Sequence, residues 1–198
     1  MSLLSFKCQR CGQCCSDPSL IVTITHRDLL RFEFFSPTFD LFKIVSFYQT
    51  SDADRSIEEK LMTPAIITNH GKIFLGLQRI NDRCIFLNEK LCQIYDARPL
   101  ICHSFPYTFQ VRDNQIYWGY SLKAKEFCPA IKGKSKINKK HLEHLASIIL
   151  KEFEEFKQLI HIWNTLAQKE LIDPTPQTLL SFLTGKIKLT VENLGNMT

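Results

Sequence analysis

The chain has 198 residues, which at about 150 residues per domain is the size of one domain with an additional segment. Hydrophobic residues make up 44% and charged residues 23%, and this composition excludes a disordered chain, a collagen and a low-complexity linker. The stretch 132–140 contains five lysines and no acidic residue, which accounts for the whole net charge of +5. We therefore predict a solvated linker there, and no nucleic acid as a partner.

The N-terminal residues lack the features of a secretory signal, which are a basic region, a long apolar run and a small-residue cleavage site. No stretch approaches the roughly 18–20 apolar residues that a membrane span requires, so no membrane contact is expected. The sequence thus predicts a cytoplasmic protein. Because thiols stay reduced in the cytosol, clustered cysteines there are expected to be metal ligands or catalytic groups rather than disulfides.

Several short elements are predicted before residue 62. The β-branched run Leu20–Ile24 is typical of a strand. Thr25, followed three residues later by Asp28, has the pattern of a capping box and predicts a helix that ends near Pro37. The apolar residues between 39 and 47 favour a short helix, and the polar stretch 51–60 is predicted to be a loop.

Between residues 62 and 120, short apolar runs alternate with turn residues. The turn Asn69-His70-Gly71 predicts one hairpin, and the turn Arg112–Asn114 predicts another. Further turn residues lie on both sides of the run 84–87. The segment 91–96 is long enough for one or two helical turns before Pro99.

The C-terminal third is predicted to be helical. Apolar residues recur at helical spacing from Leu142 to Leu166, which predicts an amphipathic helix of about eight turns with Asn138 as its N-cap. Thr175-Pro176 predicts the start of a second helix that Gly185 ends. The segment 186–191 is predicted to be a strand or a tail.

Eight cysteines are the most informative feature of the chain. Four of them form the run C-x2-C-x2-C-C, and none occurs after residue 128. Thiolates are soft ligands for zinc, Cu(I) and iron–sulfur clusters, and a C-x2-C loop lets two sulfurs reach one metal. Gly12 can supply the positive φ that such a loop often needs. The candidate metal ligands are Cys8, Cys11, Cys14, Cys15, Cys84, Cys92, Cys102 and Cys128.

Helix geometry limits what the first four cysteines can do. In one regular helix, Cys8 and Cys15 would lie about 10 Å apart along the axis. Two sulfurs on one zinc ion are at most about 4.6 Å apart. Either the segment is a loop, or its cysteines divide between two centres.

Two metal interpretations remain open. Eight thiolates could form two closed zinc sites of four cysteines each. Alternatively, Cys8, Cys11 and Cys14 match the first three ligands of a bacterial ferredoxin run, with Cys128 as a remote fourth, although Pro18 stands where the fourth cysteine of that run would be.

The wider pattern resembles a known family. It comprises Phe6-x-Cys8-x2-Cys11-Gly12-x-Cys14-Cys15, then Cys84-Ile85-Phe86-Leu87, then Cys92-x-Ile94-Tyr95-x2-Arg98-Pro99-x2-Cys102-x2-Phe105-Pro106, then Cys128-Pro129. This pattern is similar to that of the CxxCxxCC zinc- or iron-chelating domain, the YkgJ-like cysteine cluster proteins. All eight cysteine positions of the family are filled between Phe6 and Ala130, and His103 stands where members often carry Arg.

The resemblance implies a protein that binds zinc or iron through the eight-cysteine cluster. A similar cluster in flagellin lysine N-methylases implies an alternative: an iron–sulfur enzyme or an accessory protein that acts in protein modification, such as lysine N-methylation. The chain has only seven glycines and no glycine-rich loop for S-adenosylmethionine, so whether it is an enzyme is left open, as is a protein partner.

Together these observations predict an α+β fold. A small, irregular, cysteine-rich core of short strands would hold the metal, with a long C-terminal helix packed on it. Residues 1–131 would form the cysteine-cluster metal-binding domain, and residues 132–198 its helical extension.

Overall fold

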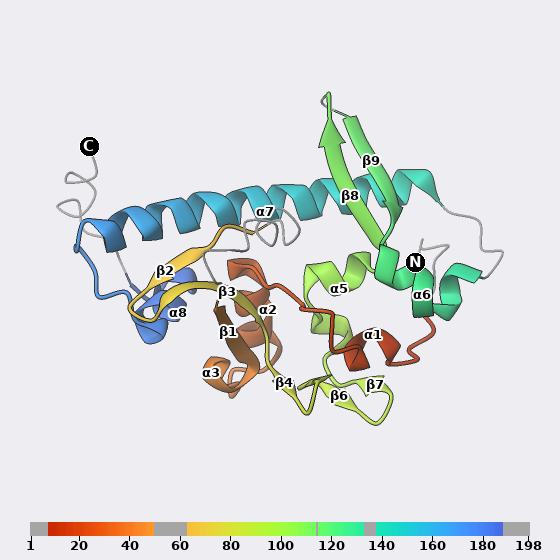
Figure 1. Ribbon diagram of the computed structural model, residues 1–198, viewed down its shortest axis with the longest axis horizontal. Helices are drawn as coiled ribbons and strands as arrows, with labels where there is room; N and C mark the ends of the chain where they lie inside the picture. The colour runs from red at the N-terminus through yellow and green to blue at the C-terminus, as the bar shows by residue number, and fades with distance from the viewer. Residues whose placement is uncertain (1–7, 50–62, 114, 133–137, 188–198) are drawn as a thin grey trace. The chain divides into compact units, whose positions relative to one another are not determined.

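The computed structural model describes residues 8–49, 63–113, 115–132 and 138–187 (Figure 1). It combines a long helix, several shorter helices and short antiparallel strands, which confirms the α+β class. The loop predicted at 51–60 and the residues 133–137 of the lysine-rich stretch lie outside the described residues. None of the described helices combines the length and apolar character needed to cross a membrane.

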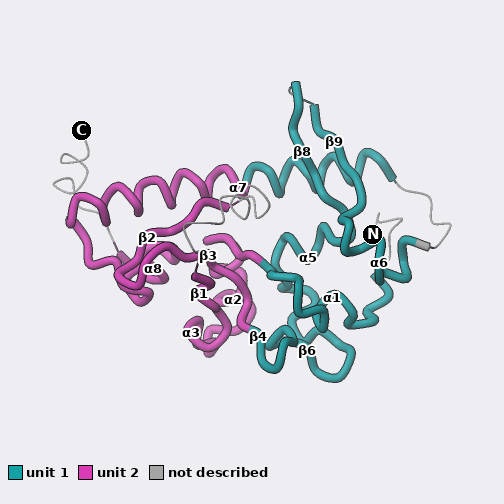
Figure 2. The backbone as a smooth tube through the Cα atoms, in the orientation of Figure 1, with its two compact units in different colours: residues 1–22, 79–151 teal, residues 23–78, 152–198 magenta. Residues whose placement is uncertain are grey.

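The chain divides into two compact units (Figure 2). Unit 1 comprises residues 1–22 and 79–151, and unit 2 comprises residues 23–78 and 152–198. Each unit therefore contains two separate stretches of chain, and one helix contributes to both. The predicted division into domains 1–131 and 132–198 stays a prediction. The two units are defined by the compactness of their contacts, which does not show which segments fold independently.

Unit 2 is built around a three-stranded antiparallel sheet of strand order β1-β3-β2. The strands are β1 Val45–Gln49, β2 Ile66–Thr68 and β3 Gly71–Leu77. The hairpin predicted around Asn69-His70-Gly71 is present, with Thr68 opposite Gly71. Gly71 has a φ of 100°, a conformation that glycine adopts without a steric penalty.

Two helices of unit 2 precede β2. The helix α2, His26–Phe35, begins with the predicted capping box between Thr25 and Asp28. The helix α3 covers only Leu41–Ile44, so the short helix predicted near 39–47 is present, but the last three residues of that segment belong to strand β1. Val45, Phe47 and Tyr48 favour a strand once a neighbouring strand is available for pairing.

The strand predicted at Leu20–Ile24 is wrong. Within the described residues, this segment pairs only through an isolated bridge between Thr23 and Gly76. The carbonyl oxygen of Leu20 instead accepts a hydrogen bond from the Arg79 guanidinium at 2.9 Å. A side chain thus satisfies the backbone group that a strand neighbour would otherwise occupy.

The helix α7, Lys139–Gln168, confirms the predicted amphipathic helix of about eight turns, and the backbone N–H of His141 donates to the Asn138 side chain at 3.2 Å. Its second half belongs to unit 2, where Trp163 Nε1 donates to the carbonyl oxygen of Ile67 at 2.7 Å. Asn164 accepts from the Ile67 N–H and donates to Ala65. These bonds attach the helix to strand β2.

The helix α8, Pro176–Leu183, begins as predicted after Thr175 and ends before Gly185, which has a φ of 71°.

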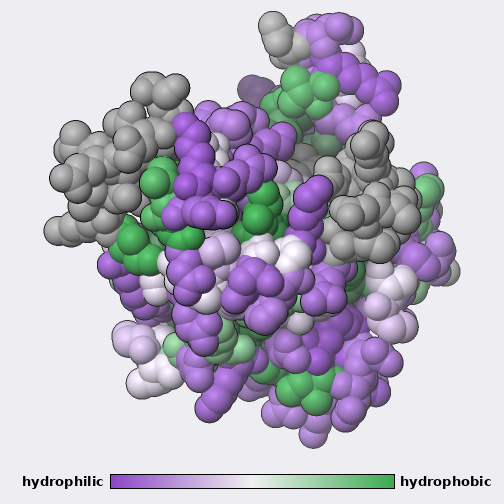
Figure 3. Space-filling view, turned by 60° about the vertical axis from the view of Figure 1, so that its left-hand side comes forward, coloured by the Kyte–Doolittle hydropathy of each residue, from purple (hydrophilic) through white to green (hydrophobic). Residues whose placement is uncertain are grey.

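Unit 2 has a large apolar core. Trp163, Phe32, Phe74 and Phe156 are among its most deeply buried side chains. On the face drawn in Figure 3, hydrophobic residues form separate groups among hydrophilic ones.

Unit 1 consists of short elements. Two hairpins of two-residue strands follow each other: β4 Arg79–Ile80 with β5 Arg83–Cys84, and β6 Leu87–Asn88 with β7 Leu91–Cys92. Asn81, Asp82 and Glu89 have positive φ in the turns, where asparagine and aspartate are tolerated best. A 3-10 turn η1, Tyr95–Ala97, follows. The helical turn predicted within 91–96 is therefore present before Pro99, but it begins only at Tyr95, because Leu91 and Cys92 form strand β7.

The rest of unit 1 is a longer hairpin between helical segments. Strands β8 Tyr107–Arg112 and β9 Gln115–Tyr120 form the second predicted hairpin. The remaining segments are α1 Gln13–Ser16, α5 Leu100–Ser104, α6 Leu122–Phe127, the 3-10 turn η2 Pro129–Lys132 and the first half of α7. All eight cysteines belong to this unit.

Candidate metal centre

The first cysteine run is a loop that leads into one helical turn. Cys8 and Cys11 precede helix α1, and Cys14 and Cys15 lie within it. The backbone N–H of Arg10 points to the Cys8 sulfur at 3.4 Å, and Arg10 has a positive φ of 52°. The four cysteines therefore do not form one regular helix, in agreement with the limit that helix geometry sets.

Gly12 makes the turn between the two cysteine pairs. Its φ is 72°, which confirms the positive φ predicted for it, and its carbonyl oxygen accepts from the N–H groups of Cys15 and Ser16. A Cβ at this position would lie 3.0 Å from the carbonyl oxygen of Lys90. The loop is thus packed directly against the β6–β7 hairpin.

The four dispersed cysteines come from four different elements. Cys84 ends β5, Cys92 ends β7, Cys102 lies in α5 and Cys128 caps the C-terminus of α6. Phe105 and Phe127 stack with their ring centroids 6.1 Å apart, which links the end of α5 to α6. The fold therefore collects in one unit cysteines that are up to 120 positions apart in the sequence.

Arg79 fixes the segment that follows the first run. Its guanidinium donates to the carbonyl oxygen of Asp17 at 2.8 Å and also to those of Leu20 and Asp82. A single side chain thereby holds the chain after α1 against the β4–β5 hairpin that carries Cys84. The sequence gives no signal for this role, because Arg79 lies outside every cysteine motif.

Cys14 and Cys15 form a closely interacting pair, with their sulfur atoms 3.9 Å apart. The hydrogen bond from Cys15 lowers the pKa of the Cys14 thiol from 9.0 to about 7. The same interaction raises the pKa of Cys15, and burial and the charges of Cys14, Cys102 and Cys84 raise it further. Cys14 is therefore the thiol of this pair that ionises more readily.

Burial and the charges of neighbouring cysteines raise the pKa of three other thiols. Burial raises the pKa of Cys84, and the charges of Cys92 and Cys14 add to this effect. Burial also raises the pKa of Cys92, with contributions from Cys14 and Cys8. For Cys128 the pKa is raised by burial and by the charges of Cys11 and Cys14. Each of the eight cysteines thus takes part in at least one of these interactions.

A cation offsets part of this accumulated negative charge. The charge of the Arg98 guanidinium adds to the lowering of the Cys14 pKa and opposes the rise in the pKa of Cys92. It also donates to the carbonyl oxygen of Tyr95 at 2.6 Å, so it caps the turn before Pro99. Positive charge next to a group of thiols favours the thiolate form that a metal requires.

All eight cysteines are free thiols. Within residues 8–49, 63–113, 115–132 and 138–187, no three His, Cys, Asp or Glu side chains are arranged as they would be around one ion. The assignment of the eight cysteines as ligands stays a prediction. The donor set itself fits a soft metal, because it consists of thiols that come within electrostatic reach of one another.

Unit 2 contains a different candidate site. An open hollow of about 500 Å³ is lined by side chains of both polar and apolar type, among them Phe42, Phe47, His70 and Gln177. It contains no cysteine and no carboxylate. The cysteine group of unit 1 is therefore the stronger candidate for chemistry.

The comparisons with known proteins agree with the cysteine pattern. Residues 7–129 match the family CxxCxxCC, whose description is "Putative zinc- or iron-chelating domain". This match covers more than half of the chain. The chain belongs to the CxxCxxCC family.

A curated relative is the uncharacterized protein MJ0661 of Methanocaldococcus jannaschii. It is 26% identical over 170 residues, which cover 78% of each chain. No solved structure matches the chain. The match to this relative extends over more residues than the match to the CxxCxxCC family, so part of the likeness lies outside residues 7–129.

The substitution Gly12→Ala tests the cysteine loop. An alanine at φ 72° is strained by about 1–2 kcal/mol, and its Cβ also meets the Lys90 backbone at 3.0 Å. We expect unit 1 to lose about 2 kcal/mol or more of unfolding free energy in a urea titration. Gly119→Ala is the matched control, because Gly119 has no positive φ and a Cβ there meets nothing within 4 Å. Equal stability of the two variants would contradict this account.

Proposed function

We propose that the protein binds zinc or iron through the thiolates of its eight cysteines, Cys8, Cys11, Cys14, Cys15, Cys84, Cys92, Cys102 and Cys128. The observation that carries this proposal is the collection of all eight thiols in unit 1, each within electrostatic range of another. A chain without a ligand to bind has no evident reason to bring so many thiols together, because their mutual repulsion disfavours the thiolate forms.

The chemistry of the donor set supports zinc or iron over harder cations. Thiolates suit zinc and iron–sulfur clusters, whereas magnesium and calcium prefer oxygen ligands. Eight thiolates are the number needed for two closed sites of four. Bound metal would supply crosslinks between the loop at Cys8–Cys15 and elements as distant in sequence as the end of α6.

A role as metal ligands also implies a location. Thiols that bind a metal must stay reduced, which is expected in a reducing compartment, and we place the protein in the cytoplasm. The cysteines would otherwise be expected to oxidise to disulfides.

Elemental analysis and an absorption spectrum on one anaerobically purified sample test the metal. About two zinc ions per chain and no visible absorption are the result expected for two closed four-thiolate sites. Iron with acid-labile sulfide and a broad visible band would assign an iron–sulfur centre to the same cysteines.

The variant Cys84→Ser tests the ligand set, because Cys84 is the most buried of the eight cysteines. We expect it to lower the metal content by at least about one equivalent, since a closed site rarely survives the loss of one of four ligands. Ser121→Ala in the same unit is the control, because the Ser121 side chain makes no capping bond. Metal-free wild type after anaerobic purification and reconstitution would refute the proposed function.

A further inference from the structure

Tyr95 lies between two arginines of unit 1. The guanidinium carbon of Arg10 is 3.9 Å from the centre of the Tyr95 ring, and that of Arg98 is 3.8 Å from it. Two guanidinium groups cannot both occupy one face of a ring at these distances, so they lie on opposite faces. Each contact is a cation–π interaction, which Arg forms readily because its planar group stacks on aromatic rings.

The two arginines belong to different parts of the cysteine cluster. Arg10 lies between Cys8 and Cys11, and its own backbone N–H points to the Cys8 sulfur. Arg98 follows the 3-10 turn η1 and is fixed to it by its hydrogen bond to the Tyr95 carbonyl oxygen. Tyr95 itself comes three residues after Cys92. The stack therefore links the first C-x2-C loop to the segment that carries Cys92.

The stack joins the Cys8–Cys11 loop to a residue that is distant in the sequence. Cys11 has a thiol contact with Gln13 at 3.6 Å, within its own segment. Arg10 is exposed, and Tyr95 is only partly buried, so the stack is not part of an apolar core. Core packing therefore does not explain why three such large side chains are aligned beside the cysteines.

We propose that Tyr95, stacked between Arg10 and Arg98, is a positioning residue that holds Cys8 and Cys11 beside Cys92, so that the first C-x2-C pair and the dispersed cysteines reach a common metal. The metal part of this inference rests on the proposed function.

The first test uses the protein as purified under reducing conditions, so that unit 1 is folded whether or not it holds a metal. Reduced protein is alkylated with iodoacetamide, and the rate at each cysteine is followed by peptide mass spectrometry. We expect Tyr95→Leu to raise the rates at Cys8 and Cys11 roughly three- to tenfold relative to Cys84, because it removes both cation–π contacts. Tyr95→Phe keeps the ring and should restore the wild-type rates.

Two further variants keep this test decisive. Tyr117→Leu in strand β9 is the matched control, because Tyr117 is a half-exposed tyrosine of the same unit, and it should leave the rates at Cys8 and Cys11 unchanged. Arg10→Gln removes one contact from an exposed position, so it tests the stack even where Tyr95→Leu fails to fold. We expect it to raise the two rates about two- to fivefold.

The second test measures the release of bound zinc to a chromophoric chelator. Tyr95→Leu should release at least one equivalent about tenfold faster than wild type, while Tyr95→Phe and Tyr117→Leu release it at the wild-type rate. Unchanged alkylation in both Tyr95→Leu and Arg10→Gln would overturn the positioning role while leaving metal binding intact. Faster alkylation in a protein that takes up no metal would instead support the stack and refute the proposed function.

Discussion

Removal of the metal with a chelator is expected to unfold unit 1 and to leave unit 2 folded. Metal binding by a structural four-cysteine zinc site supplies on the order of 10–16 kcal/mol of apparent folding free energy. A whole domain is stable by only about 5–15 kcal/mol. Loss of the metal should therefore shift the unfolding of unit 1 below room temperature, an effect larger than that of any single substitution considered for this protein.

The unequal distribution of the core explains why the two units should respond differently. Of the twelve largest fully buried side chains among the described residues, ten belong to unit 2, and only Ile94 and Ile149 belong to unit 1. Unit 2 contains no cysteine. A unit with so small an apolar core needs crosslinks to be stable, as small metal-bound domains do.

Hydrogen exchange measured by mass spectrometry checks this prediction, because it resolves the two units by peptide. After chelation under reducing conditions, peptides from β4 to α6 should exchange at once, and peptides from β3 and the second half of α7 should stay protected. Tryptophan fluorescence gives a second readout. The only two tryptophans are Trp118 in unit 1 and Trp163 in unit 2, so the variant Trp118→Phe reports unit 2 alone.

Two outcomes decide whether bound metal stabilises unit 1. Restored protection on adding zinc back is expected if the metal is the crosslink. Unit 1 that remains protected, with an unchanged melting temperature after complete metal removal, would show that the thiols do not hold the fold together.

The helices were the most predictable part of the fold, because their signals are local. Thr25 and Asp28 specify a capping box by themselves, and the period of apolar residues from Leu142 to Leu166 specifies one face of a helix. Strand β1 was missed for the opposite reason. The residues Val45–Gln49 form a strand because they pair with β3, and a local sequence pattern does not identify a partner some thirty positions away.

The candidate site shows the same contrast between local and distant information. The spacing of the cysteines identifies them as candidate ligands, and the positive φ of Gly12 follows from the needs of a tight loop. The roles of Arg79 and Arg10 could not be predicted, because their partners are backbone carbonyls and a tyrosine ring elsewhere in the chain. Which four thiols share a metal is a question of the same kind, since it depends on side-chain placement and not on spacing.

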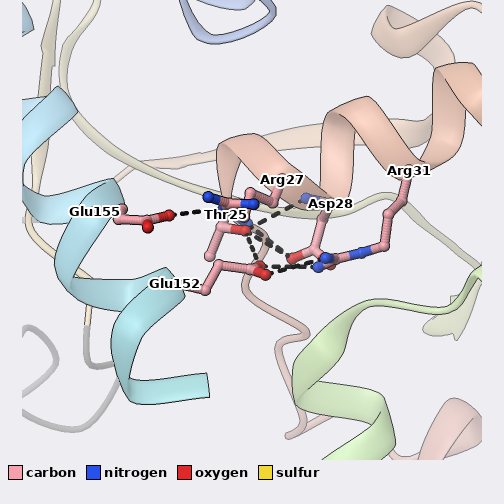
Figure 4. A network of polar contacts seen from close by, with 6 residues as sticks. All are labelled: Thr25, Arg27, Asp28, Arg31, Glu152 and Glu155. Carbon is pink, nitrogen blue, oxygen red and sulfur yellow. Dashed lines mark hydrogen bonds and ion pairs between the residues drawn. The ribbon is translucent and has the colours of Figure 1, made fainter. Parts of the chain in front are cut away.

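Unit 2 contains a network of charged and polar side chains, of which the sequence predicts only the Thr25–Asp28 capping box (Figure 4). Glu152 lies on the apolar face of α7, three residues after Ile149 and four before Phe156, which is an unusual place for a carboxylate. It accepts hydrogen bonds from Arg31 at 2.8 and 3.0 Å and from Thr25 at 2.5 Å. Asp28, the acidic member of the capping box, forms an ion pair with the same arginine.

Arg31 is therefore the one cation between two buried carboxylates in this network, and Arg31→Met is expected to destabilise unit 2 by about 3 kcal/mol at pH 7. Breaking a buried ion pair is strongly destabilising, and Arg31 pairs with two buried carboxylates, Asp28 and Glu152. Urea unfolding followed through Trp163 fluorescence in the Trp118→Phe background measures the loss. Arg27→Met is the matched control, because Arg27 lies on the same helix and pairs with Glu155 of the same partner helix at 2.7 Å, but half of its side chain is exposed. That pair should contribute less than about 1 kcal/mol.

Acid should partly reverse the effect of Arg31→Met, and this response separates electrostatics from lost packing. Burial already raises the pKa of Asp28 above 3.8, and Arg31 opposes that rise, so the substitution moves the pKa of Asp28 further up. A carboxyl group whose pKa is higher in the folded than in the unfolded state binds more protons when folded, so stability increases as the pH falls. The deficit of Arg31→Met relative to its parent should therefore shrink between pH 7 and pH 5, whereas that of Arg27→Met should stay constant. A deficit that is equal at both pH values would mean that the methylene groups of Arg31, and not its charge between the two carboxylates, stabilise the packing of α2 against α7.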